Sequence, residues 1–212
     1  MPRERFGEQH TFLPRRAYLS FPEIEKVVVA CKPLGLEKVR ITGGEPLLRP
    51  DLHELISRLS ATGLEVALTT NASLLPQQAA KLAEAGLNRV TVSLDALDPE
   101  VHSQMTDSNI PVDTVLDGIE AALEAGLTPL KVNCVVQRGV NETEVAPLVR
   151  HFRGTGVTVR FIEYMDVGRT NGWQLGQVVP SADILTHLQG EFDLVSVESQ
   201  RPSDVARRWA HS

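Results

Sequence analysis

Two hydrophobic patterns alternate along the chain. Apolar residues that recur every three or four positions predict helices at residues 20–35, 51–63, 76–87, 112–127 and 141–156, and from Ser181 onward. Short runs rich in β-branched residues predict strands at residues 38–44, 65–71, 89–96, 130–136 and 159–166. Because single helices separate these strands, we expect parallel strands joined by right-handed crossovers. The pattern leaves two architectures, a doubly wound open sheet and a barrel.

Two of the predicted helices begin with a short polar residue that is followed three positions later by glutamate. Ser20 precedes Glu23, and Asn141 precedes Glu144. This spacing is typical of a capping box, in which the two side chains accept hydrogen bonds from free backbone N–H groups at the start of a helix. We therefore expect a capping box at both helices.

One phase of the predicted strands is polar, although parallel strands covered by helices are usually apolar on both faces. The polar positions are Lys38, Arg40, Thr42, Thr69, Asn71, Arg89, Thr91, Ser93, Asp95, Lys131 and Asn133. Such a face fits the inside of an open, wet barrel that holds a large polar ligand. Because five strands cannot close an eight-stranded barrel, we expect an α/β fold, a partial (β/α) barrel of parallel strands with outer helices. Residues 1–212 would form one incomplete domain.

Composition narrows the function. The chain has 212 residues, 42% of them apolar, and a net charge of −6, which argues against binding to a nucleic-acid backbone. No segment has the length of a membrane span or the apolar core of a secretory signal, so we expect a cytoplasmic protein. Cys31 and Cys134 are far apart and belong to no metal-binding pattern, so both are predicted to be small core residues.

Chemistry in parallel α/β folds gathers at the carboxyl ends of the strands. Gly43 and Gly44 follow the first strand and leave the backbone open to a ligand, and Glu45 can accept hydrogen bonds from an ammonium group. A tight strand-to-helix turn explains the same residues equally well. Ser93 and Asp95 at the end of the third strand could contact a ligand, or they could have the purely structural role of capping the following turn.

Several of these features occur in the order and register of one known family. The matching stretches are "FLPR", "KVRITGGEPLLR", "LTTNASLL", "RVTVSLDALDPEV", "KVNCVVQRGVN", "RFIEYMDVG" and "NGWQLGQVVPS". The sequence thus resembles the radical S-adenosylmethionine (SAM) superfamily, and within it the GTP 3′,8-cyclases. It departs from their pattern at Ala72, where glycine is usual.

The resemblance implies a role for specific residues. It places SAM against Gly44, Glu45, Ser93 and Met165, and GTP against Arg40, Thr69 and Lys131, with Lys38 and Arg160 adding positive charge near the triphosphate. Guanidinium and ammonium groups converging in a cavity are what a triphosphate needs. The alternative for Lys38, Arg40 and Lys131 is pairing with inward carboxylates such as Asp95 or Glu163, and the alternative for Met165 is ordinary core packing.

The resemblance also implies an activity. Family members use SAM and [4Fe-4S] clusters to convert GTP to 3′,8-cyclo-7,8-dihydro-GTP in molybdenum cofactor biosynthesis. Cyclic pyranopterin monophosphate synthase acts next in that pathway, and a homodimer is compatible with the family. No nucleic acid or membrane partner is expected.

The cluster cysteines of the family have no match in this sequence. In the family, a C-x-x-x-C-x-x-C loop directly precedes a segment like "MPRE", and a second cysteine triad lies in a later C-terminal region. We therefore expect no metal ligand here and a chain truncated at both ends, either a fragment or the product of a misassigned start codon. One alternative is a degenerate paralogue that binds SAM or GTP without catalysis. The other is an unrelated barrel enzyme such as an aldolase, with Lys131 forming a Schiff base.

Overall fold

The computed structural model describes residue 14 and residues 17–166, 173–198 and 206–212. Of the motifs quoted above, "MPRE", most of "FLPR" and the junction at residues 167–172 lie outside the described residues. The helices are α2 (Phe21–Cys31), α3 (Leu52–Ala61), α4 (Leu75–Glu84), α5 (Pro99–Thr106), α6 (Val112–Glu124), α7 (Val145–Phe152) and α8 (Ser181–Gln189). Short 3₁₀ turns lie at η2 (Lys32–Leu34), η3 (Pro46–Leu48), η4 (Glu142–Glu144) and η5 (Leu175–Gln177).

Five strands form one parallel sheet, as the alternation of helices and strands predicted. They are β1 (Lys38–Ile41), β2 (Glu65–Thr70), β3 (Arg89–Ser93), β4 (Lys131–Val136) and β5 (Thr158–Glu163), and they lie in the order β1-β2-β3-β4-β5. Each strand therefore pairs with its neighbour in sequence, which is the arrangement of a barrel wall rather than of a doubly wound sheet. The described residues form an open sheet, so the predicted partial α/β architecture is confirmed.

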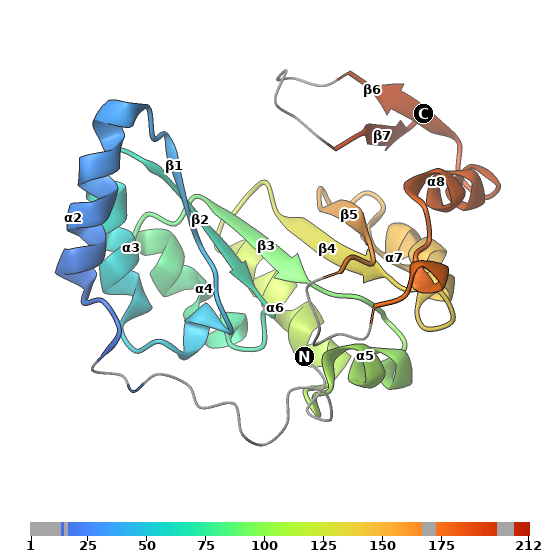
Figure 1. Ribbon diagram of the computed structural model, residues 1–212, viewed down its shortest axis with the longest axis horizontal. Helices are drawn as coiled ribbons and strands as arrows, with labels where there is room; N and C mark the ends of the chain where they lie inside the picture. The colour runs from blue at the N-terminus through green and yellow to red at the C-terminus, as the bar shows by residue number, and fades with distance from the viewer. Residues whose placement is uncertain (1–13, 15–16, 167–172, 199–205) are drawn as a thin grey trace.

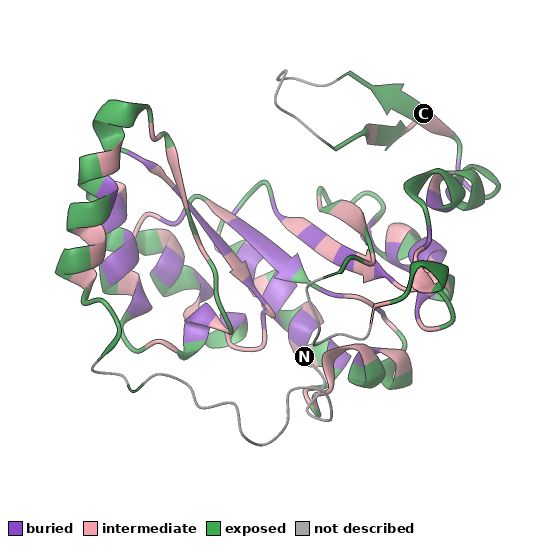
Figure 2. Cartoon of the chain, in the orientation of Figure 1, coloured by how far each residue is buried: buried purple, intermediate pink, exposed green. Residues whose placement is uncertain are grey.

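The sheet has one apolar and one polar face. On β4, Val132, Cys134 and Val136 are buried, whereas Lys131 and Asn133 remain partly exposed (Figure 2). Helices α2, α3, α4 and α6 gather along one side of the sheet (Figure 1). We call the opposite side the polar face; it carries Lys38, Arg40, Glu65, Thr69, Arg89, Thr91, Lys131, Asn133 and Arg160, whose strand register places them on one side.

Helix α6 packs closely against the turn that follows β2. A Cβ atom at Gly118 would lie 2.4 Å from the backbone oxygen of Ala72, so only glycine fits there. Ala72 itself is fully buried and has a φ of 63°, which explains why glycine is the usual residue at its position. The departure from the family pattern at Ala72 therefore lies at a strained backbone position.

One predicted capping box is confirmed and the other is wrong. The Glu23 carboxylate accepts hydrogen bonds of 2.7 Å from both the backbone N–H and the hydroxyl of Ser20, at the start of α2. The Asn141 side chain does not cap a helix; its Oδ1 accepts a hydrogen bond from the backbone N–H of Gln137. Helix α7 begins only at Val145, after a 3₁₀ turn, because Asn141 and Glu144 are both bonded elsewhere.

Three elements or boundaries differ from the prediction. Helix α5 was not predicted because its only buried residue is His102, which gives no apolar stripe. The antiparallel hairpin of β6 (Leu194–Val197) and β7 (Arg208–His211), beyond α8 in Figure 1, was not predicted either. Strands β1, β3 and β5 each end three residues before the predicted end, at the turns that hold the polar motifs. Cys134 is buried as expected, but Cys31 is only partly buried.

Candidate functional site

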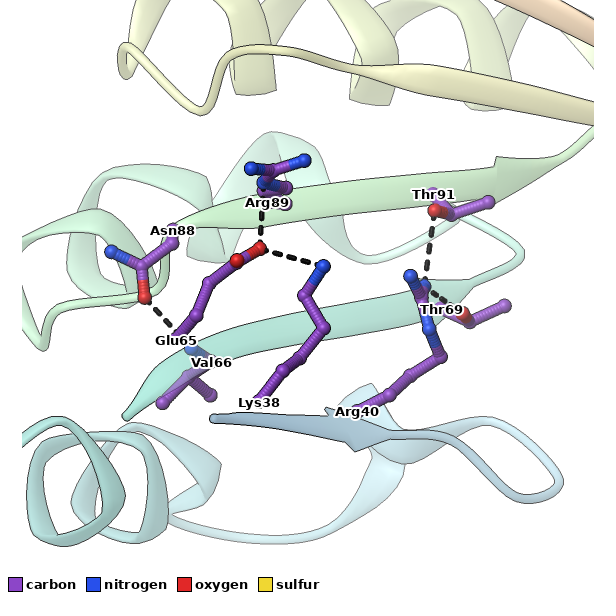
Figure 3. A network of polar contacts seen from close by, with 8 residues as sticks. All are labelled: Lys38, Arg40, Glu65, Val66, Thr69, Asn88, Arg89 and Thr91. Carbon is purple, nitrogen blue, oxygen red and sulfur yellow. Dashed lines mark hydrogen bonds and ion pairs between the residues drawn. The ribbon is translucent and has the colours of Figure 1, made fainter. Parts of the chain in front are cut away.

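A bridged ion pair lies at the amino end of the polar face. The Glu65 Oε1 atom lies 2.9 Å from the Lys38 ammonium nitrogen and 2.6 Å from Arg89 Nε (Figure 3). Lys38 and Glu65 are directly opposed on β1 and β2, and Arg89 is the first residue of β3. One carboxylate thus holds two cations from the two neighbouring strands.

Arg40 makes neutral contacts in the middle of the polar face. Its Nη1 atom donates hydrogen bonds of 2.9 Å to Thr69 Oγ1 and 3.1 Å to Thr91 Oγ1 (Figure 3). Among the described residues, no carboxylate pairs with this guanidinium group. The structure therefore brings together Arg40 and Thr69, which the motif comparison placed at the same ligand, and leaves the charge of Arg40 uncompensated.

Lys131 lies next to Thr91 in the register of β3 and β4. Burial lowers the pKa of its ammonium group, and the nearby positive charges of Arg160, Arg208, Arg89 and Lys38 lower it further. No carboxylate in the described part of the chain forms an ion pair with it. A bound anion would offset the repulsion between the Lys131 ammonium group and these neighbouring cations.

The carboxylates proposed as alternative partners are engaged elsewhere. Asp95 Oδ1 accepts a hydrogen bond of 2.8 Å from the backbone N–H of Val135, and Glu163 accepts bonds from the backbone N–H and hydroxyl of Ser181. Those hydrogen bonds lower the pKa of Glu163. Lys38 does pair with a carboxylate, as this alternative expects, but the carboxylate is that of Glu65 and not of Asp95 or Glu163. The alternative is wrong for Arg40 and Lys131 within the described residues.

A glycine turn follows β1 at the carboxyl edge of the sheet. Gly43 has a φ of 149°, and a Cβ atom at either Gly43 or Gly44 would meet no atom within 4 Å. The turn is held by Glu45, whose carboxylate accepts hydrogen bonds from the Leu47 N–H, the Thr70 hydroxyl and the Asn71 N–H at 2.7 to 3.0 Å. Glu45 therefore joins the ends of β1 and β2, and the glycines leave open backbone beside it.

Ser93 and Met165 lie at the same edge of the sheet. Ser93 is the exposed last residue of β3, and Met165 follows β5 with 53% of its surface exposed. That exposure argues against the alternative that Met165 is an ordinary core residue. The structure thus places Gly44, Glu45, Ser93 and Met165 at the carboxyl edge, while the GTP candidates lie along the polar face.

A buried polar network supports this edge, and the sequence pattern did not predict it. Asn141, fully buried, donates hydrogen bonds to the backbone oxygens of Asp95 and Val135, and Glu144 accepts them from the N–H groups of Leu97 and Asp98. The signal was present as the spacing from Asn141 to Glu144, but it was interpreted as a helix cap. Burial raises the pKa of Asp95 to about 6.

The described residues do not fit an iron–sulfur cluster. Such a cluster needs several thiolates, and burial raises the pKa of the Cys134 thiol well above its usual range, which disfavours the thiolate. The sequence has only one other cysteine, Cys31. The one group of potential metal ligands among the described residues, Asp51, His53 and Glu54, contains no cysteine.

The sequence pattern of the radical SAM superfamily matches residues 5–152. The chain belongs to the radical SAM superfamily. This membership makes the hypothesis of an unrelated barrel enzyme wrong, even though the lowered Lys131 pKa that it required is present.

Curated relatives are similar over the whole chain. The chain is 46% identical to a GTP 3′,8-cyclase of Acidothermus cellulolyticus over 100% of its own length and 59% of that protein. It is 49% identical to one of Xanthomonas axonopodis pv. citri over 99% of the chain and 63% of that protein, and 44% identical to one of Staphylococcus carnosus over 100% and 62%. The radical SAM chain thus spans about three fifths of the length of these relatives.

Solved structures support the fold. SuiB of Streptococcus suis bound to S-adenosylmethionine superimposes with a TM-score of 0.67 at 20% identity, over 84% of this chain and 41% of that one. The radical SAM enzyme coproporphyrinogen III oxidase (HemN) of Escherichia coli gives a TM-score of 0.60 at 14% identity, over 88% and 48%. Among the described residues, no helix has both the length and the apolar content that a membrane span requires.

Proposed function

We propose that this radical SAM chain serves in the cyclisation of GTP to 3′,8-cyclo-7,8-dihydro-GTP, a step of molybdenum cofactor biosynthesis. The observation that carries the proposal is the pair of cations Arg40 and Lys131 on the polar face, with which no carboxylate among the described residues forms an ion pair, on the same sheet as an open glycine turn. A triphosphate would bring negative charge to these two cations. The similarity to curated GTP 3′,8-cyclases over the whole chain supports the same substrate.

GTP would lie with its phosphates along the polar face. Arg40 and Thr69, already hydrogen-bonded to each other, would contact the nucleotide together, and Lys131 would meet the phosphates with its ammonium group. Arg160, which is opposite Asn133 on β5, adds a further positive charge to that side. Lys38 lies closer to the amino end, where Glu65 already binds it.

SAM would lie across the carboxyl edge. Open space at Gly44 lets a ligand approach the backbone closely, Ser93 offers an exposed hydroxyl, and Met165 offers an exposed apolar surface. Glu45 already accepts three hydrogen bonds from the protein, so its main contribution is to hold the turn against which SAM binds. The residues named here would bind and orient the two ligands.

A second candidate function is that of a paralogue that binds SAM or GTP without catalysis. Within the described residues, Cys134 is buried and burial raises the pKa of its thiol, so it is no candidate for a cluster ligand. In either case we infer a single domain over residues 1–212 and a cytoplasmic location. Cyclic pyranopterin monophosphate synthase is the partner expected to use the product, and a homodimer is compatible with this proposal.

The test combines binding with catalysis in the full chain. Calorimetry should show GTP binding that Lys131→Ala weakens at least tenfold, the effect of losing one charge-assisted contact, while SAM binding stays unchanged. Absence of GTP binding in the unmutated chain, or equal loss of both ligands in the variant, would refute the GTP assignment. Iron reconstitution followed by mass spectrometry of the nucleotide product then separates the cyclase from the non-catalytic paralogue.

A further inference from the structure

The ion pair of Glu65 with Lys38 and Arg89 is a feature that the proposed contacts with GTP do not explain. The side chains are 28% exposed for Glu65 and 37% exposed for each of the two cations. Ion pairs with this much exposure contribute little to stability, because water screens the charges. Fold stability is therefore a weak reason for placing a carboxylate among so many cations.

The carboxylate divides the cations of the polar face into two groups. Lys38 and Arg89 are bound to Glu65 at the amino end (Figure 3). Arg40 and Lys131 pair with no carboxylate in the described part of the chain. Arg89 precedes Thr91 by two residues on β3, and Thr91 is opposite Lys131. The two groups are thus separated by about 7 Å along the strand.

We infer that Glu65 sets the inner limit of the phosphate site, so that the site takes a triphosphate and gains nothing from a longer phosphate chain. This inference rests on the proposed function in placing nucleotide phosphates on the polar face. A phosphate that advanced past Lys131 would approach a carboxylate of like charge and would have to displace it from two cations. Glu65 is therefore a specificity-determining residue that acts by repulsion.

The decisive variant removes the charge and keeps the shape. In Glu65→Gln, Lys38 and Arg89 lose their anionic partner and become available to a further phosphate. Glu65→Asp keeps the charge on a shorter side chain and should retain the limit. Glu124→Gln, an exposed position at the end of the outer helix α6, makes the same change in net charge away from the polar face.

The measurement compares inorganic tripolyphosphate with tetrapolyphosphate by calorimetry. The unmutated chain, Glu65→Asp and Glu124→Gln should bind the two anions with affinities within about twofold, whereas Glu65→Gln should bind tetrapolyphosphate about tenfold more tightly than tripolyphosphate, the effect of one added charge-assisted contact. Thermal unfolding of each variant checks that the fold is retained.

The outcomes separate this inference from the proposed function. An unchanged ratio in Glu65→Gln, weaker binding of both anions, or a tenfold preference for tetrapolyphosphate already in the unmutated chain would each overturn the limit. Binding of neither anion to any variant would also overturn it. If the chain binds tripolyphosphate with the expected ratios but GTP does not compete, the cyclase function fails while the limit set by Glu65 stands.

Discussion

The side-chain amide of Asn141 donates a hydrogen bond of 2.8 Å to the backbone oxygen of Asp95. This bond ties the segment after β3 to the turn after β4, and a second bond of 2.9 Å from the same amide reaches Val135. Both strand ends lie at the carboxyl edge, where Ser93 is exposed. The amide therefore fixes the edge against which SAM is proposed to bind, without itself facing the ligand.

Asn141→Ala should destabilise the protein strongly. The substitution removes the hydrogen bonds of a fully buried amide to the Asp95 and Val135 oxygens and from the Gln137 N–H, and leaves the Asp95 oxygen, within the described residues, with only the long contact to the Cys134 thiol. We expect a loss of about 2–4 kcal/mol in the free energy of unfolding. Urea denaturation measures it. Asn109→Ala, at an exposed position, is the control and should change the free energy by less than about 0.5 kcal/mol. Equal effects at the two sites would show that the network contributes little.

Asp95 should make the protein more stable in mild acid than at neutral pH. Burial raises its pKa from 3.8 to about 6, so the folded state binds a proton more tightly than the unfolded state. The stabilising contribution is complete below pH 4 and is lost as the pH rises through about 6.

Asp95→Asn isolates this effect because asparagine keeps an oxygen that can accept the Val135 N–H bond. Relative to the variant, the unmutated protein should lose up to about 3 kcal/mol between pH 4 and pH 7, as measured by denaturation at each pH. A constant difference between the two proteins across that range would contradict a raised pKa.

The two glycines of the β1 turn should respond differently to alanine. Gly44 has neither a left-handed φ nor a close neighbour, so Gly44→Ala should leave the free energy of unfolding unchanged or raise it by about 0.4–1 kcal/mol. Gly43→Ala should lower it by about 1–2 kcal/mol, since φ is 149° there. If Gly44 contacts SAM, Gly44→Ala should still weaken SAM binding in calorimetry; unchanged affinity in a folded variant would exclude that contact.

The parallel sheet was predictable because single helices separate its strands, and the polar phase from Arg40 through Lys131 indicated the face that the helices do not cover. Glu65 was missed although it shares this phase with Thr69. Ala67 lies between them, and its small apolar side chain interrupts the pattern on β2. The alternation of side chains along β2 places Glu65 on the same face as Thr69, two positions beyond Ala67. The two cations that pair with Glu65 come from other strands, so only the sheet register brings them together.

The network of Asn141 and Glu144 was unpredictable for a different reason. The spacing of the two residues is equally compatible with a local cap and with long-range bonds, and the choice depends on which backbone groups lack partners. The ends of β3 and β4 leave such groups at Asp95, Leu97 and Val135. Their side-chain partners are 46 residues away for Asp95, 47 for Leu97 and 6 for Val135. Local sequence carries no information about that requirement.

Binding of GTP should draw a proton onto Lys131. Burial and neighbouring cations lower the pKa of the free ammonium group, and a bound triphosphate favours its charged form, so the pKa rises on binding. Above the lowered pKa, GTP affinity should therefore fall as the pH rises, and each binding event should take up protons. Calorimetry in two buffers of different ionisation enthalpy, repeated at increasing pH above about 7.5, measures the uptake over a range where phosphate, with a second pKa of about 6, is largely ionised. Lys131→Arg keeps the charge at all these pH values and should abolish the uptake. Uptake that persists in Lys131→Arg would assign the proton to another group.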